Sequence, residues 1–202
     1  MRKFALITIM TTAALLGSAM VAQASPLKDY SAGHVAIDLG YSSPTSLNFT
    51  EHGNDGKKGS VYGGATVGIG NKMAVGYKYN QFKSSGDPKV TAQQVNLYYK
   101  ALPGVSVYGG LVNARTNADD RNETQNSGQI GVQAAYDIPL FATVYGNIGV
   151  GNKMNSWEIG LSKALVNNLD LNVSYFDNRF KDIEQGGDVK AHGINVGLTL
   201  KF

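Results

Sequence analysis

From residue 35 onward, apolar and polar side chains alternate with a period of two along most of the chain. The last nine residues show it most clearly, because apolar side chains there alternate with Asn195, Gly197, Thr199 and Lys201. The apolar members of this segment are Ile194, Val196, Leu198, Leu200 and Phe202. A period of two predicts a β-strand with one apolar face and one polar face.

The same alternation recurs in separate segments along the chain. Ten such segments are predicted as strands: 35–41, 61–69, 73–82, 91–102, 105–113, 129–138, 142–150, 156–165, 169–180 and 189–202. A tilted strand of ~9–11 residues is long enough to cross a bilayer. The pattern therefore predicts an all-β, antiparallel, up-and-down transmembrane barrel of ten strands, with an eight-stranded barrel as the alternative.

The connections between the segments alternate in length. Long polar segments are expected at 42–60, 84–89, 114–128 and 181–188, with a shorter fifth member at 151–155. Short turns are expected at 70–72, 102–104, 138–141 and 166–168. Long loops on one rim and short turns on the other are typical of outer-membrane barrels. An even number of strands then places both termini on the short-turn rim.

The first 24 residues have the features of a secretory signal peptide. Arg2 and Lys3 precede a mostly apolar stretch over residues 4–20. Ala22-Gln23-Ala24 is a small-residue cleavage site, which places cleavage after Ala24. The expected organisation is a signal peptide at 1–24 followed by one barrel domain at 25–202. An N-terminal membrane anchor is the alternative, although the apolar stretch is short and no stop-transfer charges follow it.

Composition narrows the chemistry that the chain can perform. There is no cysteine, so disulfides and thiolate sites are excluded. The formal net charge is +3, of which Arg2 and Lys3 contribute two, so there is no basic field that would favour nucleic acid. After residue 24 no stretch of ~18 apolar residues occurs, so no transmembrane helix is expected.

Signal peptide, alternating strands, asymmetric connections and a terminal Phe202 together resemble the small bacterial outer-membrane β-barrel proteins of the opacity and porin type. This resemblance covers residues 25–202 and implies localisation in a bacterial outer membrane of the Gram-negative type. It implies that the alternating segment ending at Phe202 is the signal read by the barrel-assembly machinery. The implied partners are outer-membrane lipids and lipopolysaccharide, and an extracellular ligand is left open.

The polar phase of the strands predicts the lining of the barrel. Its charged members are Asp38, Lys78, Lys100, Asp137, Glu158, Asp170 and Lys201. They are compatible with a narrow water-filled pore or with a filled interior of salt bridges and hydrogen bonds. Aromatic residues on the apolar phase predict girdles at the membrane interfaces; they are Tyr41, Tyr77, Tyr79, Tyr99, Tyr136, Trp157, Tyr175 and Phe202.

Two enzymatic interpretations stay open. A lipid-A acyl hydrolase would need a serine beside His192, but the same-face neighbour at position 194 is Ile194. A rim protease of the omptin type would draw on candidates that all fall in predicted loops: His52, Asp55, Asp119 and Asp120. Lys57 and Lys58, in the first long connection, are positioned to meet lipopolysaccharide phosphates or simply to be solvated.

The sequence thus predicts an integral outer-membrane protein with a structural or surface-interaction role and no catalysis. A narrow porin-like pore for small solutes is the alternative, and a lipid-modifying or proteolytic barrel enzyme is the third possibility. No catalytic residue, cofactor or metal site is expected.

Overall fold

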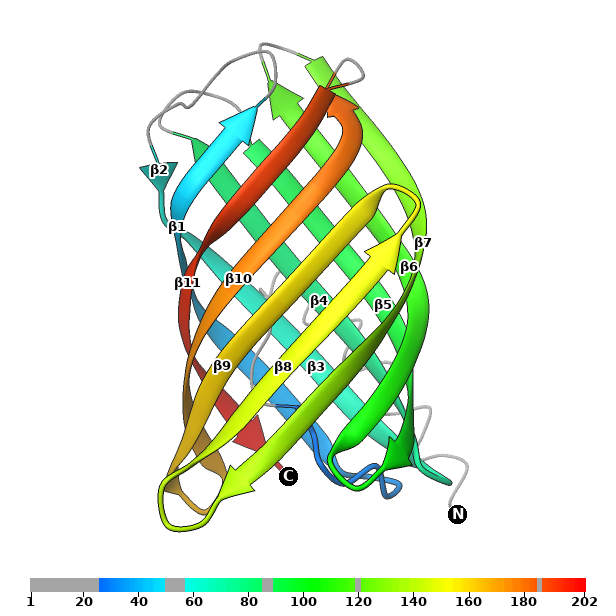
Figure 1. Cartoon of the computed structure of the whole chain (residues 1–202), viewed down its shortest axis with the longest axis vertical. Coiled ribbons are helices and arrows are strands. Elements are labelled where there is room, and N and C mark those ends of the chain that lie inside the picture. The colour runs from blue at the N-terminus through cyan, green and yellow to red at the C-terminus, as the bar shows by residue number, and fades with distance from the viewer. Residues whose placement is uncertain (1–25, 50–56, 85–88, 119–120, 185–186) are drawn as a thin grey trace.

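The computed structural model describes residues 26–49, 57–84, 89–118, 121–184 and 187–202, and they form a closed antiparallel barrel (Figure 1). Its wall is made of β1 (Val35–Phe49), β3 (Ser60–Gly70), β4 (Met73–Ser84), β5 (Lys89–Leu102), β6 (Val105–Ala118), β7 (Arg121–Ile138), β8 (Ala142–Gly151), β9 (Met154–Val166), β10 (Leu169–Glu184) and β11 (Gly187–Lys201). A further two-residue strand, β2 (Lys57–Lys58), extends the wall beside β4.

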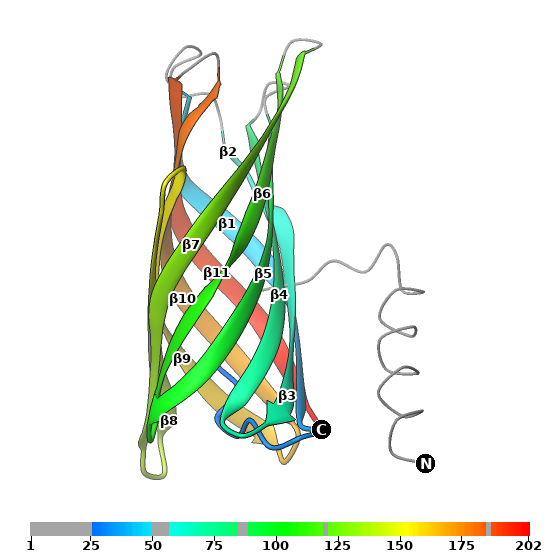
Figure 2. The ribbon, with the colours of Figure 1, turned by 90° about the vertical axis from the view of Figure 1, so that its right-hand side faces the viewer.

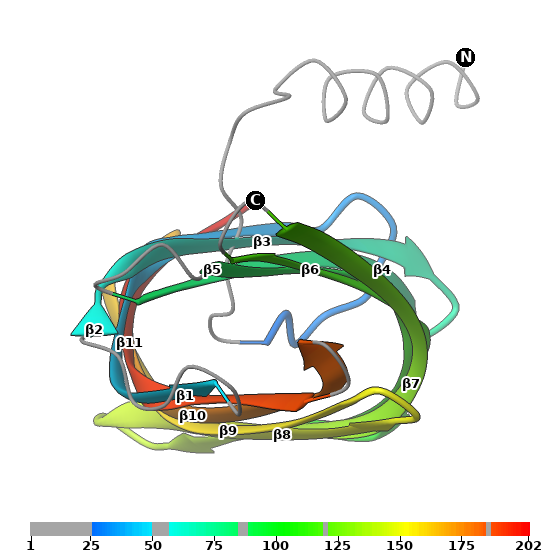
Figure 3. The same ribbon diagram turned by 90° about the horizontal axis from the view of Figure 1, so that it is seen from above.

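Each wall strand pairs with its neighbours in the chain, and β1 pairs with β11 to close the ring. Val35 and Phe202 exchange backbone hydrogen bonds of 3.0 and 2.9 Å at this seam. Seen from above, the barrel is a flattened oval (Figure 3). The predicted fold class is confirmed, with ten strands and not eight.

The short turns lie together at the lower rim of Figure 1, where the chain enters β1 and leaves β11. The β3–β4 turn needs left-handed backbone at two residues, and Asn71 (φ 52°) and Lys72 (φ 63°) supply it in a type I′ turn. In the β5–β6 turn Gly104 has φ 75°, and a Cβ there would meet the Ala135 carbonyl oxygen at 2.5 Å. The expected short-turn rim therefore follows from local turn chemistry.

Three of the connections expected to be long loops are mostly strand. β1 runs to Phe49, β6 and β7 extend across most of 114–128, and β10 and β11 extend into 181–188. β7 has 18 residues and β10 has 16, well beyond the ~9–11 needed to cross a bilayer. We call the upper part of the wall the upper extensions; it comprises β2 and residues 81–84, 89–93, 112–118, 121–127, 176–184 and 187–192. In Figures 1 and 2 it rises above the β8–β9 hairpin.

The outer wall carries a belt of exposed apolar side chains below the upper extensions. Its members include Leu39, Val75, Val95, Leu97, Val107, Leu111, Ile130, Val132, Ile148, Ile159, Leu161, Leu171, Val173, Val196 and Leu198. In water, exposure of such side chains would be unfavourable and a soluble barrel would bury them, whereas contact with lipid carries no such cost. No helix in the described ranges is long and apolar enough to span a membrane.

Candidate functional site: the barrel interior and the upper extensions

The interior of the upper extensions holds a buried apolar cluster. Its members are Phe82, Val90, Ala92, Val112, Ala114, Met154, Phe176, Phe180, Ile183, Val189 and Ala191, which we call the upper cluster. All of them are at most 3% exposed. The Phe82 ring on β4 lies 5.5 Å from Phe176 and 6.1 Å from Phe180 on β10, measured between ring centroids. Because β4 and β10 are not neighbours in the wall, these rings meet across the lumen.

The polarity of the two wall faces reverses at the base of the upper extensions. Below this level, apolar side chains face outward and polar ones inward. Above it, the outward side chains are polar and include Thr91, Gln93, Asn113, Arg115, Asp177, Arg179 and Lys190. Most of the alternating inward side chains there belong to the upper cluster, with Thr116 and Asn178 as buried polar exceptions. The wall pairs Val95 with Leu111 and Gln93 with Asn113, so the switch occurs at one level on both strands. The upper extensions are thus built like a soluble barrel, with a core inside and polar groups outside.

Below the upper cluster the interior is a polar network. The Asn147 amide donates to Glu158 at 3.1 Å, and the Ser174 hydroxyl donates to the other oxygen of the same carboxylate. The Gln129 amide donates to the Gln94 oxygen at 3.0 Å and to Asn96 at 2.7 Å. These groups are buried, so each hydrogen bond offsets part of the cost of removing a polar group from water.

A second buried carboxylate lies near the lower end of this network. Asp170 accepts a hydrogen bond from Ser162 at 3.0 Å and forms an ion pair with Lys201. The Asn172 amide donates to the Thr199 hydroxyl at 2.7 Å. The Gln94 amide also reaches the Met154 sulfur at 3.8 Å, which joins the polar network to the upper cluster.

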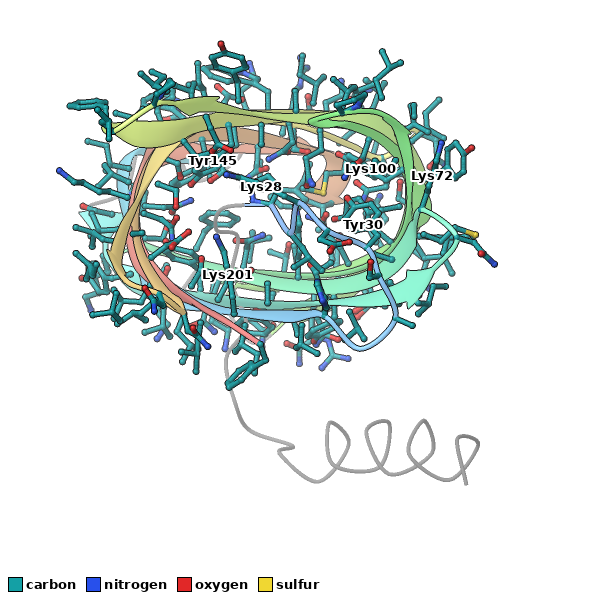
Figure 4. The ribbon with its side chains drawn as sticks, turned by 90° about the horizontal axis from the view of Figure 1, so that it is seen from below. Lys28, Tyr30, Lys72, Lys100, Tyr145 and Lys201 are labelled. Carbon is teal, nitrogen blue, oxygen red and sulfur yellow. The ribbon has the colours of Figure 1, made fainter. Side chains whose placement is uncertain are left out.

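Residues 26–34 fold into the lower mouth of the barrel, and we call them the lower plug (Figure 4). The Tyr30 hydroxyl donates to Ser106 at 3.0 Å, and the Lys100 ammonium donates to the Lys28 carbonyl at 2.7 Å. Lys28 in turn donates to Thr143 at 2.9 Å and pairs with Asp137. The lower plug is therefore fixed to several strands of the wall by side-chain contacts.

Backbone and ring contacts complete this docking. Gly70 N–H donates to the Tyr30 carbonyl at 2.9 Å, and Gly68 N–H donates to the His34 carbonyl at 2.8 Å. A Cβ at Gly68 would lie 2.4 Å from the Ser31 carbonyl oxygen, so only glycine fits there. The Tyr30 ring lies 6.4 Å from that of Tyr98.

Two groups of the lower plug have shifted pKa values. Burial raises the pKa of the Tyr30 phenol, although its hydrogen bond to Ser106 works in the opposite direction. The Ser31 hydroxyl and backbone N–H both donate to Asp29 and lower the pKa of that exposed carboxyl. His34 Nδ1 lies 3.2 Å from Asp29. Ser31 is bonded to the carboxylate and not to the imidazole, so these three residues do not form a hydrolase triad.

The charged residues predicted to line the barrel fall at different levels. Asp38, Lys78, Glu158 and Asp170 are buried inside the wall. Lys100 and Lys201 contact partners at the lower end, and Asp137 is mostly exposed at the lower rim, where it holds Lys28. The inward phase is polar only up to the base of the upper extensions. Above that level the inward positions are mainly apolar, a feature that the sequence analysis did not predict.

The predicted assembly segment lies on the seam strand β11, and its apolar row faces outward. Ile194, Val196, Leu198, Leu200 and Phe202 are 39–63% exposed and continue the apolar belt. Among the predicted girdle aromatics, Trp157 and Tyr175 lie 5.5 Å apart between ring centroids, on neighbouring strands. Ala22 and Ala24, the predicted cleavage site, lie outside the described residues.

The structure does not assemble the enzymatic candidates. His192 lies on the outer wall with its ring 6.2 Å from Tyr175, beside Ile194 as the sequence indicated. His52, Asp55, Asp119 and Asp120 lie outside the described residues. Within the described ranges no group of three or more His, Asp or Glu side chains is arranged to hold a metal ion.

The sequence analysis did not predict the two features that close the lumen, the upper cluster and the lower plug. The upper cluster was detectable in principle, because Phe176 and Phe180 follow Ser174 in the same inward phase of one strand. The predicted strands 73–82 and 169–180 include Phe82, Phe176 and Phe180, but alternation alone does not show that inward side chains of separate strands meet. The lower plug had no such signal, since residues 26–34 have no alternation and dock only through tertiary contacts.

Comparison with solved structures finds similar chains among bacterial surface proteins. Ail, the attachment invasion locus protein of Yersinia pestis, is 13% identical, with 85% of this chain and 99% of Ail covered and a TM-score of 0.42. Neisserial surface protein A is 19% identical, with coverages of 84% and 96% and a TM-score of 0.46. The outer membrane protein AlkL is 12% identical, with coverages of 90% and 97% and a TM-score of 0.40. No protein-family model and no curated protein matches the chain.

The class of the protein follows from its own geometry. The wall is a closed, ten-stranded, antiparallel barrel with short turns at one rim, and an apolar belt surrounds it on the outside. Closure satisfies the backbone hydrogen bonds of the wall, and the belt matches hydrocarbon. The chain therefore has the fold of the small outer-membrane β-barrel proteins.

Proposed function

We propose that this protein is an integral outer-membrane barrel that does not conduct solutes and that acts through the surface of its upper extensions. The observation that carries the proposal is the upper cluster. Its rings close the lumen from opposite walls, and its members are almost completely buried. A structural or surface-interaction role without catalysis is the function that such a closed barrel supports best.

A dry apolar layer opposes a pore for a simple physical reason. An ion that crosses it must give up its hydration shell and finds only isolated polar groups, such as Asn178 and Thr116, in return, which costs many kcal/mol. The polar network below the cluster could hold water, but it is covered above by the cluster and below by the lower plug. Two independent barriers thus lie in series along the axis.

The upper extensions themselves support a surface role. They place polar side chains outside, over a fixed apolar core, so the exposed strands are held in a defined shape. Flexible loops alone would not need an interior core. Ordered strands that extend beyond the membrane are suited to a protein whose outer surface is bound by a partner. They are equally suited to a structural component of the envelope.

Conductance in planar lipid bilayers tests the proposal. We expect the refolded protein to give no steady current above the bare membrane. The triple variant Phe82→Ser/Phe176→Ser/Phe180→Ser breaches the upper cluster, and Lys28→Ala/Tyr30→Ala loosens the lower plug. Each alone should stay closed, and the two combined should conduct.

Folding of every variant is checked first by heat-modifiable migration on gels. A steady, salt-dependent current through the unaltered protein would overturn the proposal and favour the porin-like alternative. Current from the lower-plug variant alone would show that the upper cluster does not seal the lumen, and would overturn it equally.

A further inference from the structure

One side of the upper extensions carries a row of cations on adjacent strands. In the wall register Lys58 of β2 lies directly opposite Lys83 of β4, and Lys83 lies directly opposite Lys89 of β5. Neighbouring strands are about 4.8 Å apart, so these three backbone positions lie within roughly 10 Å. Arg115 of β6 is opposite Thr91, which follows Lys89 on the same face of β5.

These side chains point away from the barrel interior. Phe82 and Val90 are buried in the upper cluster, so Lys83 and Lys89, which adjoin them in the chain, face outward. A shallow polar pocket of about 140 Å³ lies on this outer face between β5 and β6. It is lined by Lys89, Thr91, Gln93, Asn113, Arg115 and Asn117.

Two cations on the other side of the barrel pair with carboxylates, unlike those of this row. There, Arg179 pairs with Asp188 at 2.5 Å and Lys153 pairs with Asp182 at 2.7 Å. Among the described residues no carboxylate pairs with Lys58, Lys83, Lys89 or Arg115. Like charges directly opposite one another on a sheet are destabilising, so an anion that fits between them would relieve this repulsion.

The level of the pocket on the barrel wall indicates which kind of anion it binds. Gln93 and Asn113 form its base, and each is two residues above an apolar belt residue on the same face, Val95 or Leu111. Two residues span about 7 Å along a strand. The pocket therefore begins where hydrocarbon ends, at the level of lipid headgroups, and a continuous apolar wall lies directly below it.

We propose that this face binds the phosphate group of a lipid of the outer leaflet. The phosphate occupies the pocket between Lys89 and Arg115, and the acyl chains lie along the belt at Val95 and Leu111. Arg115 supplies a fork of donors for phosphate oxygens, Lys83 and Lys89 supply point charges, and Thr91 and Asn117 supply neutral donors. Lys58 extends the positive field along the row. The site is independent of whether the barrel conducts.

The experiment measures binding of fluorescently labelled diphosphoryl lipid A to the full, refolded protein in detergent micelles, by anisotropy. The test variant is Lys89→Gln/Arg115→Gln. The matched control is Lys181→Gln/Lys190→Gln, which removes the same charge from the β10–β11 side. Near-surface cations each contribute about a factor of five to binding of anionic lipid, so we expect the test variant to lose roughly 10- to 30-fold in affinity. The control should stay within about twofold.

Two competitors identify the source of the phosphate. Dephosphorylated lipid A should bind the unaltered protein as weakly as diphosphoryl lipid A binds the test variant, and inorganic phosphate should fail to displace labelled lipid A at millimolar concentration. Equal losses in test and control variants would mean general electrostatic attraction and would overturn the site. Unchanged binding of dephosphorylated lipid, or displacement by inorganic phosphate, would overturn a lipid phosphate as the occupant. Should the test variant fail to fold, Lys83→Gln/Lys89→Gln replaces it under the same criteria.

Discussion

Tyr175 and Asp177 lie two residues apart on the same outer face of β10, and the boundary of the apolar belt runs between them. Tyr175 packs against Trp157 at the edge of the belt. On the inward side between them, Phe176 belongs to the upper cluster. The strand continues without a break in register here, so the environment outside the wall changes while the backbone does not.

This reversal predicts that neighbouring substitutions in the upper extensions differ strongly in their effect on the unfolding free energy. Val112→Asp would place a carboxylate in the upper cluster and should cost about 3 kcal/mol or more of unfolding free energy. Asn113→Asp adds the same charge on the outer face and loses the exposed hydrogen bond that Asn113 donates to Asn126, so it should cost at most about 1 kcal/mol. Urea unfolding in detergent micelles measures both. Similar costs at the two positions would mean that the upper extensions have no dry core.

In the apolar belt it is the outward side that should be sensitive. Leu171→Arg would place a charge against hydrocarbon and should cost about 2–4 kcal/mol. The control, Asn122→Arg, adds the same charge to the outer face of the upper extensions, opposite the neutral Asn117, and should be nearly neutral. Unfolding in liposomes is the appropriate measurement, because detergent can adapt around a charge. If Leu171→Arg were as mild as its control, the belt would not be in contact with lipid.

Phe202 is predicted to act in assembly more than in stability. Its backbone pairs with Val35, and a substitution keeps those bonds whereas a deletion does not. Phe202→Ser should therefore reduce the amount of folded barrel in outer-membrane fractions of cells while leaving refolding of purified protein almost unchanged. Phe202→Tyr is the control and should assemble normally. Normal levels of the serine variant in the membrane would contradict the predicted role of the terminal aromatic residue.

Tyr30 should make docking of the lower plug sensitive to alkaline pH. Burial raises the pKa of this phenol, so its contribution to stability is fully present below pH 10 and is lost as the pH rises through the raised pKa. At pH 8, Tyr30→Phe loses the hydrogen bond to Ser106 and should cost about 1 kcal/mol. Because phenylalanine cannot ionise, the gap between the two proteins should narrow or reverse at pH 11. Melting midpoints of both proteins at the two pH values test this, and a constant gap would count against it.

The orientation of the barrel is open to a labelling test. A cysteine at Asn122, at the end of the upper extensions, should react with an impermeant maleimide on intact cells. A cysteine at Asn168, in the β9–β10 turn of the lower rim, should react only after the outer membrane is permeabilised. The chain has no native cysteine, so the signal is unambiguous. Labelling of Asn168 but not of Asn122 on intact cells would invert the topology.

The strands themselves could be predicted because their information is local. The row from Ile194 to Phe202, the Asn71–Lys72 turn and the inward phase of Asp170 and Asn172 can each be recognised from a few consecutive residues. Period-two alternation assigns the two faces of a strand without any knowledge of its partners. The ten strands of the barrel and the outward belt follow from that alone.

The sequence by itself thus determined a lipid-embedded, ten-stranded barrel, because alternation and turn chemistry act over short distances. Only the tertiary structure decided that the barrel is closed inside and where its cations gather. Phe82 and Phe180 are nearly a hundred positions apart, and they meet only because the curved wall brings β4 and β10 to face each other. Lys58, Lys83 and Lys89 become neighbours only through the register of three strands. Alternation assigns each side chain to one face of its strand. Closure of the ring then decides whether that face meets lipid, water or protein, and which residues lie opposite it.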